Sequence, residues 1–156
     1  MGKTEQEIAE LFITLFEANI TDPLTGRLAK GKKWIYDDAP RLDLAEYPRI
    51  SVTPVDSTYT QVGVGLTEQL EDVTIAVDVY SRKDDKINVT GTGDAERAEQ
   101  IVDFLAKRCR EVIRANHSTF LTNDILHVIP ETKNRSVIED DLIIERMTFK
   151  ALSVNS

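Results

Sequence analysis

Three side chains could form a nucleophilic or metal-binding site: Cys109, His117 and His127. A cysteine beside a histidine can act as a nucleophile and base, and both residue types bind zinc. Cys109 lies eight residues before His117, and the histidines are ten residues apart, which are not zinc-site spacings. Cys109 also falls on a predicted apolar helix stripe, where a cysteine is usually a small core residue. We predict no metal site, and a Cys109–histidine enzyme is the last of our alternatives.

Two stretches have features of phosphate-handling loops. Gly2-Lys3-Thr4 lacks the preceding strand and the upstream glycine that a phosphate-binding loop requires. The stretch TDPLTGRLAKGKKWIY, residues 21–36, contains a DPLTG core that resembles the opening of diguanylate cyclase domains. The Gly-Gly-acidic-Glu-Phe hairpin of those domains does not occur in this sequence. Asp22-Pro23 followed by Gly26 is a good turn by itself, so we interpret this stretch as a turn.

Acidic clusters occur at Asp37-Asp38, Asp84-Asp85 and residues 139–141. Carboxylate pairs can bind magnesium or act as acid and base. Each cluster here is flanked by turn or polar residues, so solvated loop charge is the simpler interpretation. The residues therefore give no catalytic, cofactor-binding or metal-binding assignment, and we expect a protein that is not an enzyme and has no cofactor.

The composition of the chain limits the classes to which it can belong. Its 156 residues suit one domain, residues 1–156, and 41% hydrophobic with 29% charged residues is typical of a globular chain. The formal charge of −8 acts against binding DNA or anionic lipid. One cysteine permits no internal disulfide, which suits a reducing compartment. We expect neither a signal peptide nor a membrane span.

Residues 4–20 are predicted to form an amphipathic helix. Thr4 and Glu7 form a capping-box pattern, and Pro23 disfavours helix in the residue before it. Apolar residues at helical spacing follow the cap: Ile8, Leu11, Phe12, Leu15 and Phe16. Residues 21–47 are then predicted to be a loop or hairpin, with a short strand at 34–36.

Residues 48–154 are predicted to form a sheet–helix–sheet core. The predicted extended segments are 49–55, 61–66, 71–81, 125–130 and 141–154, and a second amphipathic helix spans about 94–115. Pro54 is expected at a strand end or an edge, because proline cannot donate to a ladder. One face is expected to be apolar in each of two strands: Val73, Ile75, Val77 and Val79 in the first, and Ile143, Met147, Phe149 and Ala151, with Glu145 as the exception, in the second.

Strands and helices thus come in groups rather than in strict alternation. This order predicts an α+β fold, a mostly antiparallel β-sheet with two amphipathic helices packed on one face. The segment QVGVGL, residues 61–66, alternates apolar residues with glycine, which gives an open backbone and a weakly specified register. It would need a partner if it were an exposed edge. For residues 61–66, and likewise for Trp34 and Tyr36, the sequence is compatible with a contact between subunits and with packing within the monomer.

The sequence resembles the tail terminator, or tail completion, proteins of long-tailed bacteriophages and archaeal viruses. The resemblance lies in the order and character of the elements over residues 4–154, outside residues 21–47. An N-terminal amphipathic helix leads through a loop to YPRISV, and the long strand VTIAVDVYSR follows. A polar loop, the helix DAERAEQIVDFLAKRCREVI and a terminal strand pair ending in MTFKALSV complete the pattern.

The resemblance implies a virion protein, assembled in the host cytoplasm, that forms a homo-oligomeric ring, commonly of six copies. Such a ring caps the tail tube, contacts the tail tube protein and the head–tail connector protein, and lets DNA pass through its lumen. We expect the subunit contact at Trp34, Tyr36, Val62, Val64 and Leu66. We expect partner docking at Arg82, Lys83, Asp84, Asp85, Glu139, Asp140 and Asp141. The alternatives are a head-closure or head–tail adaptor neck protein and a small cytoplasmic protein-binding module.

Overall fold

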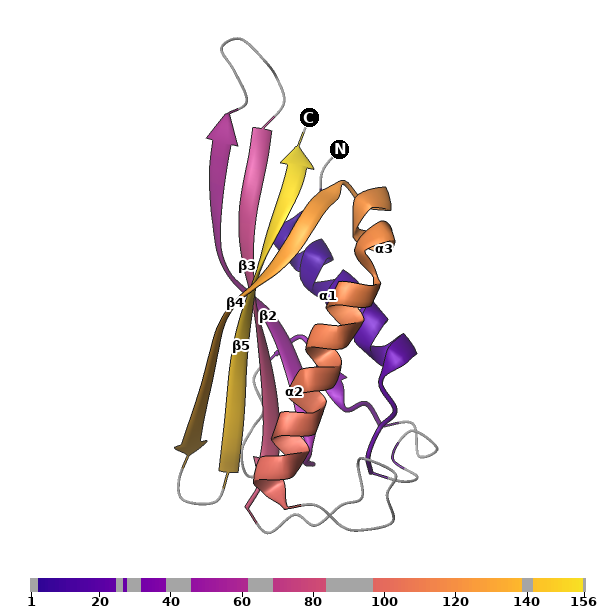
Figure 1. Cartoon of the computed structure of the whole chain (residues 1–156), viewed down its shortest axis with the longest axis vertical. Helices are drawn as coiled ribbons and strands as arrows, with labels where there is room; N and C mark the ends of the chain where they lie inside the picture. The colour runs from indigo at the N-terminus through magenta and orange to yellow at the C-terminus, as the bar shows by residue number, and fades with distance from the viewer. Residues whose placement is uncertain are drawn as a thin grey trace.

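The computed structural model of the chain describes residues 3–24, 27, 32–38, 46–61, 69–83, 97–138 and 142–155. The described part contains three helices and five strands (Figure 1). The helices are α1 (Glu5–Asn19), α2 (Ala98–Ala115) and α3 (His117–Thr122). The strands are β1 (Ile35–Tyr36), β2 (Arg49–Gln61), β3 (Gln69–Arg82), β4 (Ile125–Ile138) and β5 (Leu142–Asn155).

The strands form one five-stranded sheet in the order β1-β2-β3-β5-β4. Every neighbouring pair is antiparallel except β1 and β2, which run parallel. The helices lie on one face of this sheet, with α1 beside α2 (Figure 1). The predicted α+β class with a mostly antiparallel sheet is therefore confirmed in outline. The third helix, α3, was not predicted, and it is only six residues long.

Helix α1 begins where its capping pattern predicts. The Glu7 backbone N–H donates to Thr4 Oγ1 at 3.1 Å, and the Thr4 backbone N–H donates to Glu7 Oε1 at 3.3 Å. These reciprocal bonds satisfy two N–H groups that a helix N-terminus leaves without partners. The buried face follows the predicted stripe closely: Ile8, Ala9, Phe12, Leu15 and Phe16 are buried, and Leu11 is partly buried.

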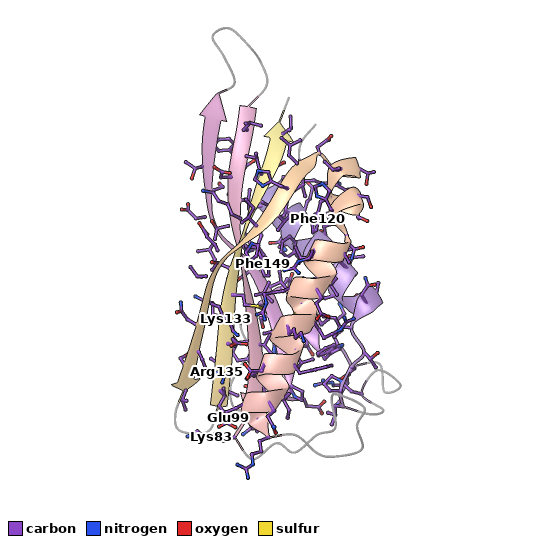
Figure 2. The ribbon with its side chains drawn as sticks, viewed as in Figure 1. Lys83, Glu99, Phe120, Lys133, Arg135 and Phe149 are labelled. Atoms are coloured by element: carbon purple, nitrogen blue, oxygen red, sulfur yellow. The ribbon has the colours of Figure 1, made fainter. Side chains whose placement is uncertain are left out.

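Four phenylalanines fill the core between the helices and the sheet. Phe12 of α1 contacts Phe16, Phe120 and Phe149, with ring centroids 5.5 to 6.1 Å apart. Figure 2 labels Phe120 of α3 and Phe149 of β5, and both side chains are buried. The predicted apolar faces of β3 and β5 point into this core, so the faces expected from their alternation are confirmed.

Side chains are also buried on the opposite face of the sheet, which no described helix covers. Tyr47, Tyr80, Leu142 and Ile144 form a second, smaller apolar cluster there. Asp78 and Ala76 of β3 are buried on the same face. The second face of β3 is therefore largely covered as well.

Three predicted boundaries differ from the structure. Strand β2 continues through Pro54 to Gln61. A bulge lies between Pro54 and Asp56, and β1 does not pair with this part of β2, so the proline interrupts no ladder with β1. Pro54 was expected at a strand end or an edge; among the described strands it lies on an edge, and it does not end the strand. Strand β4 continues past Pro130 to Ile138, again across a bulge. Helix α2 begins at Ala98, and the predicted start at residue 94 lies outside the described residues.

Among the described residues, no helix combines the length and the apolar character that a membrane crossing requires.

Candidate assembly interface

The potential nucleophile Cys109 is buried on the core face of α2. Burial raises the pKa of the Cys109 thiol far above its ordinary value, which keeps it protonated. His127 lies on the opposite face of the sheet, since its partner Leu152 alternates with the buried Ala151 and Ser153. His117 is exposed at the start of α3. The fold therefore keeps Cys109 and His127 apart, and the described residues include no cluster of three metal-ligating side chains.

Asp22 and Arg27, the first and last residues of the DPLTGR segment, form an ion pair. Asp22 Oδ1 accepts a hydrogen bond from the Leu24 backbone N–H at 2.9 Å, as an aspartate does at a turn. Arg27 donates to both oxygens of Asp22 at 2.6 and 2.8 Å, and its guanidinium lies 5.8 Å from the ring centroid of Trp34. Asp22, Arg27 and Trp34 are all nearly buried. The described residues of this segment have a structural role, which agrees with the turn interpretation.

A polar recess lies on the helix-free face of the sheet. Arg146 donates to both oxygens of Asp78 at 2.8 and 2.9 Å, from β5 to the neighbouring strand β3. Burial and the Asp78 carboxylate raise the pKa of the adjacent Tyr80 hydroxyl to about 12. The recess has a volume of about 300 Å³ and is also lined by Asn134, Ser136 and Ile144. Both oxygens of Asp78 accept hydrogen bonds from Arg146, so this ion pair links β3 to β5 and has a structural role.

Aromatic rings and arginines alternate at the lower end of the same face. The Arg49 guanidinium lies 3.9 Å from the centroid of the Tyr36 ring, and Arg82 lies 5.0 Å from the centroid of Tyr47. Arg49 also donates to the Asp38 carbonyl oxygen at 3.0 Å. Contacts of this kind stabilise a packed surface by about 0.5–1 kcal/mol each. The segments before β2 are thus fastened to the sheet through Arg49 and Arg82.

The predicted interface residues separate into three groups. Trp34 is 3% exposed and belongs to the main core, so it packs within the monomer. Tyr36 is half-buried, and its hydroxyl donates to the Lys33 carbonyl oxygen at 2.7 Å. The other three predicted contact residues lie outside the described residues: Val62, Val64 and Leu66.

The two described residues of the predicted docking set, Arg82 and Lys83, lie at one end of the sheet. Arg82 ends β3 and pairs in register with Leu142, the first residue of β5, while Ile138 at the end of β4 pairs with the same Leu142. Lys83 is exposed and is labelled at this lower end in Figure 2. The remaining docking residues lie outside the described residues: Asp84, Asp85, Glu139, Asp140 and Asp141. The described residues Arg82, Ile138 and Leu142, which adjoin the two predicted docking segments, therefore lie at the same end of the sheet.

The outer side of β4, which we call the β4 edge, is one open border of the sheet. β4 pairs with β5 alone among the described strands, over residues 125–138. All residues from Ile129 to Val137 are exposed, so neither face of this half is covered. A long uncovered edge strand offers unpaired backbone groups to another chain. Sequence analysis missed this edge because it ended the strand at Pro130.

Cations accompany the β4 edge on the side of α2. Lys133 and Arg135, labelled in Figure 2, project from β4 on the helix-facing side of the sheet, where both pair with Glu145. Arg135 also pairs with Asp103 of α2, which shows that this stripe of the helix faces β4. Further along the same stripe come Lys107, Arg110 and Arg114. A groove of about 190 Å³ runs between the two elements, with Met147 and Phe149 among its lining residues.

The opposite border, which we call the β1–β2 edge, consists of the outer sides of β1 and of β2 residues 53–61. β1 pairs with β2 only at Ile50 and Ser51, so no described strand covers β2 beyond them. Acidic side chains accompany this edge. Asp37 follows β1 and is exposed, and Asp56 is exposed on β2. A recess of about 460 Å³ lies between the start of α1 and β2, lined by Glu5, Glu71 and Tyr59 among others.

Exposed apolar side chains are concentrated on these two borders. Six large apolar residues are exposed among the described residues, and five of them lie on β2 or β4. They are Val55 and Tyr59 on β2, and Leu126, Ile129 and Val137 on β4; the sixth is Leu121 on α3. Apolar residues gathered at a sheet border mark a surface that a partner covers.

Comparison with protein-family models and with curated proteins finds no match for this chain. Its function is therefore inferred from its own residues and geometry.

Proposed function

We propose that this chain is a structural virion protein, a tail terminator whose copies form a ring, of six copies by the resemblance, that caps the tail tube and joins the tail to the head connector. The observation that carries this proposal is that two unlike borders on opposite sides of one sheet have no neighbouring strand among the described residues. When two different surfaces of one subunit meet, the interface is heterologous, and repetition gives a ring where the rotation between copies closes. A ring covers both borders of every copy.

The arrangement of charge supports passage of DNA rather than its retention. The chain carries a formal charge of −8, so its ring would release DNA from its lumen. On the helix-free face, Arg146 is paired with Asp78 and Lys150 with Asp72, so these cations offer little net charge to a phosphate. DNA would pass through such a ring without being bound.

Docking of the tail tube or of the head connector is proposed at the end of the sheet where β3 ends and β5 begins. Arg82 and Lys83 lie there, and the described ends of β4 and β5, Ile138 and Leu142, pair at the same end. The sequence of that connection supplies Glu139, Asp140 and Asp141. Residues of both signs at one end of a long sheet suit a ring that must contact two different neighbours.

The test of this function is the native mass, measured by light scattering behind size exclusion, with and without purified tail tubes. A ring-sized multiple of the 17.6 kDa monomer that binds tube ends in electron micrographs supports a tail terminator. A ring that ignores tubes but binds the isolated connector favours the head-closure or adaptor alternative. A monomer that is unchanged by tubes at every concentration contradicts both and leaves the binding module.

A further inference from the structure

We infer that the β4 edge of one copy pairs with the β1–β2 edge of a second copy, so that the sheet continues from subunit to subunit. This inference deepens the proposed ring and rests on it. Each border is therefore covered by the other border of an identical chain. Among the described residues, these two borders combine strand edges that have no described neighbouring strand with exposed apolar residues.

Strand directions determine how the two borders would meet. β2 and β5 run in one direction and β3 and β4 in the other (Figure 1). When a second copy is placed beside the first in the same orientation, its β2 runs antiparallel to β4. Antiparallel pairing is the arrangement already present between all the long strands of the chain. The junction therefore requires no new geometry of the backbone.

The levels of the apolar residues on the two borders match. Following the ladder across the sheet, Tyr59 is level with Glu71, then Ser153 and then Ile125. In the same way, Asp56 is level with Ile129. The upper part of one border therefore presents Val55 and Tyr59 at the height where the other presents Leu126 and Ile129. Two apolar stretches would be covered together.

The levels of the charges match as well. Ile35 of β1 is level with Arg135 through Ile50, Val79 and Glu145. Asp37 comes two residues further along this parallel strand, which places it near the level of Lys133. Asp37 of one border thus lies near the level of Lys133 of the other, a cation that also pairs with Glu145 within its own chain. Complementary charge at matching positions favours one partner and one register.

A twofold pairing of β4 with β4 is the competing arrangement. It would cover Leu126, Ile129 and Val137, but it would leave Val55 and Tyr59 of both copies exposed. It would also leave the acids of the β1–β2 edge without the cations of β4. A head-to-tail junction covers both sets, which is why we infer it.

Two single variants, each blocking one border, test the inference. Val55→Asp blocks the β1–β2 edge, and Ile129→Asp blocks the β4 edge; both side chains are at least half exposed, so the monomer fold should be retained. Each variant alone should be monomeric, with association weakened about a hundredfold or more, since a charge would be buried unpaired at the junction. An equimolar mixture should form a dimer of the two variants and nothing larger. Leu121→Asp, an exposed apolar residue on neither border, is the control and should assemble normally.

A charge reversal gives a second readout that does not depend on the apolar residues. Asp37→Lys should weaken association about two- to tenfold at low salt, and by less at high salt.

A dimer of Val55→Asp alone would show that β4 pairs with β4 and would overturn the head-to-tail junction. Rings formed by both single variants would overturn the inference and leave the proposed ring intact. A wild-type chain that stays monomeric at all concentrations, with and without tubes, would contradict the proposed function itself.

Discussion

Glu145 and Arg135 face each other across the β4–β5 ladder, and the Glu145 carboxylate is almost fully buried, with 1% exposed. Arg135 Nη2 donates to Glu145 Oε1 at 3.2 Å, and Lys133 Nζ lies 3.4 Å from the same oxygen. A carboxylate on the core face of β5 is thus neutralised by two cations from the edge strand. This pairing allows a charge at a position where the strand pattern calls for an apolar residue.

Loss of the cations should therefore destabilise the fold through Glu145. Arg135→Ala should lower the free energy of unfolding by about 1–2 kcal/mol, because Lys133 remains and Arg135 is partly exposed. Removing both cations should cost about 3 kcal/mol or more. Urea unfolding measures both. In a Glu145→Gln background the losses should shrink, and equal losses in the two backgrounds would mean that the cations act on something else.

Tyr80 should make the stability depend on alkaline pH. Its folded pKa of about 12 is raised from 10, first by burial and then by Asp78, so the folded state favours the protonated hydroxyl. The stabilisation is complete below pH 10 and is lost as the pH rises toward 12. The unfolding free energy should fall by about 1–2 kcal/mol over this range, after allowance for solvent screening. Tyr80→Phe, measured by urea unfolding at the same pH values, should lack this part of the decline. Parallel curves for the two proteins would contradict the prediction.

The elements that sequence patterns predicted are those whose core face repeats apolar residues at a regular spacing. Helix α1 has a local cap and a single apolar stripe, and both features are encoded within a few residues. The alternation in β3 and in β5 identified their core faces, including the exception at Glu145. Local periodicity suffices wherever burial on one side repeats regularly.

The second halves of β2 and β4 were missed for a physical reason. Residues 131–137 of β4 are exposed on both faces, so their sequence carries no alternation between apolar and polar residues. Only pairing with β5 makes them a strand, and that pairing depends on residues further along the chain. Bulges beside Pro54 and Pro130 also let each strand continue past a residue that usually ends one.

The candidate interface could not be predicted from local sequence patterns, because it depends on tertiary structure. A sheet border exists only once the strand order is known, and the sequence does not specify that β4 lies outside β5. Contacts such as Arg146 with Asp78 join residues 68 positions apart, so spacing could not indicate them. Arg27 was likewise treated as part of a loop, although it is buried against Asp22 and Trp34.

Cys109 should behave as an inert core residue. Its thiol is fully buried and its pKa is raised by burial, so a thiol reagent should label it only after unfolding. The labelling rate should follow the urea dependence of unfolding. Cys109→Ser buries a hydroxyl in place of the thiol and should lower the free energy of unfolding by about 1–3 kcal/mol. Rapid labelling of the folded protein, or loss of a thiol-dependent activity in a folded Cys109→Ser protein, would restore the enzyme alternative.

Thr4 and Thr14 provide a matched pair of substitutions within one helix. Thr4→Ala removes the acceptor for the Glu7 N–H and should lower the free energy of unfolding by about 1 kcal/mol. Thr14 is exposed in the middle of α1, where its hydroxyl donates to the Glu10 carbonyl oxygen at 2.9 Å. Thr14→Ala should be neutral or slightly stabilising, because alanine favours helix and that hydroxyl bond adds little. Thermal and urea unfolding compare the two variants. Equal losses would mean that the cap contributes no more than an ordinary surface threonine, and that packing of Phe12 and Phe16 alone sets where the helix begins.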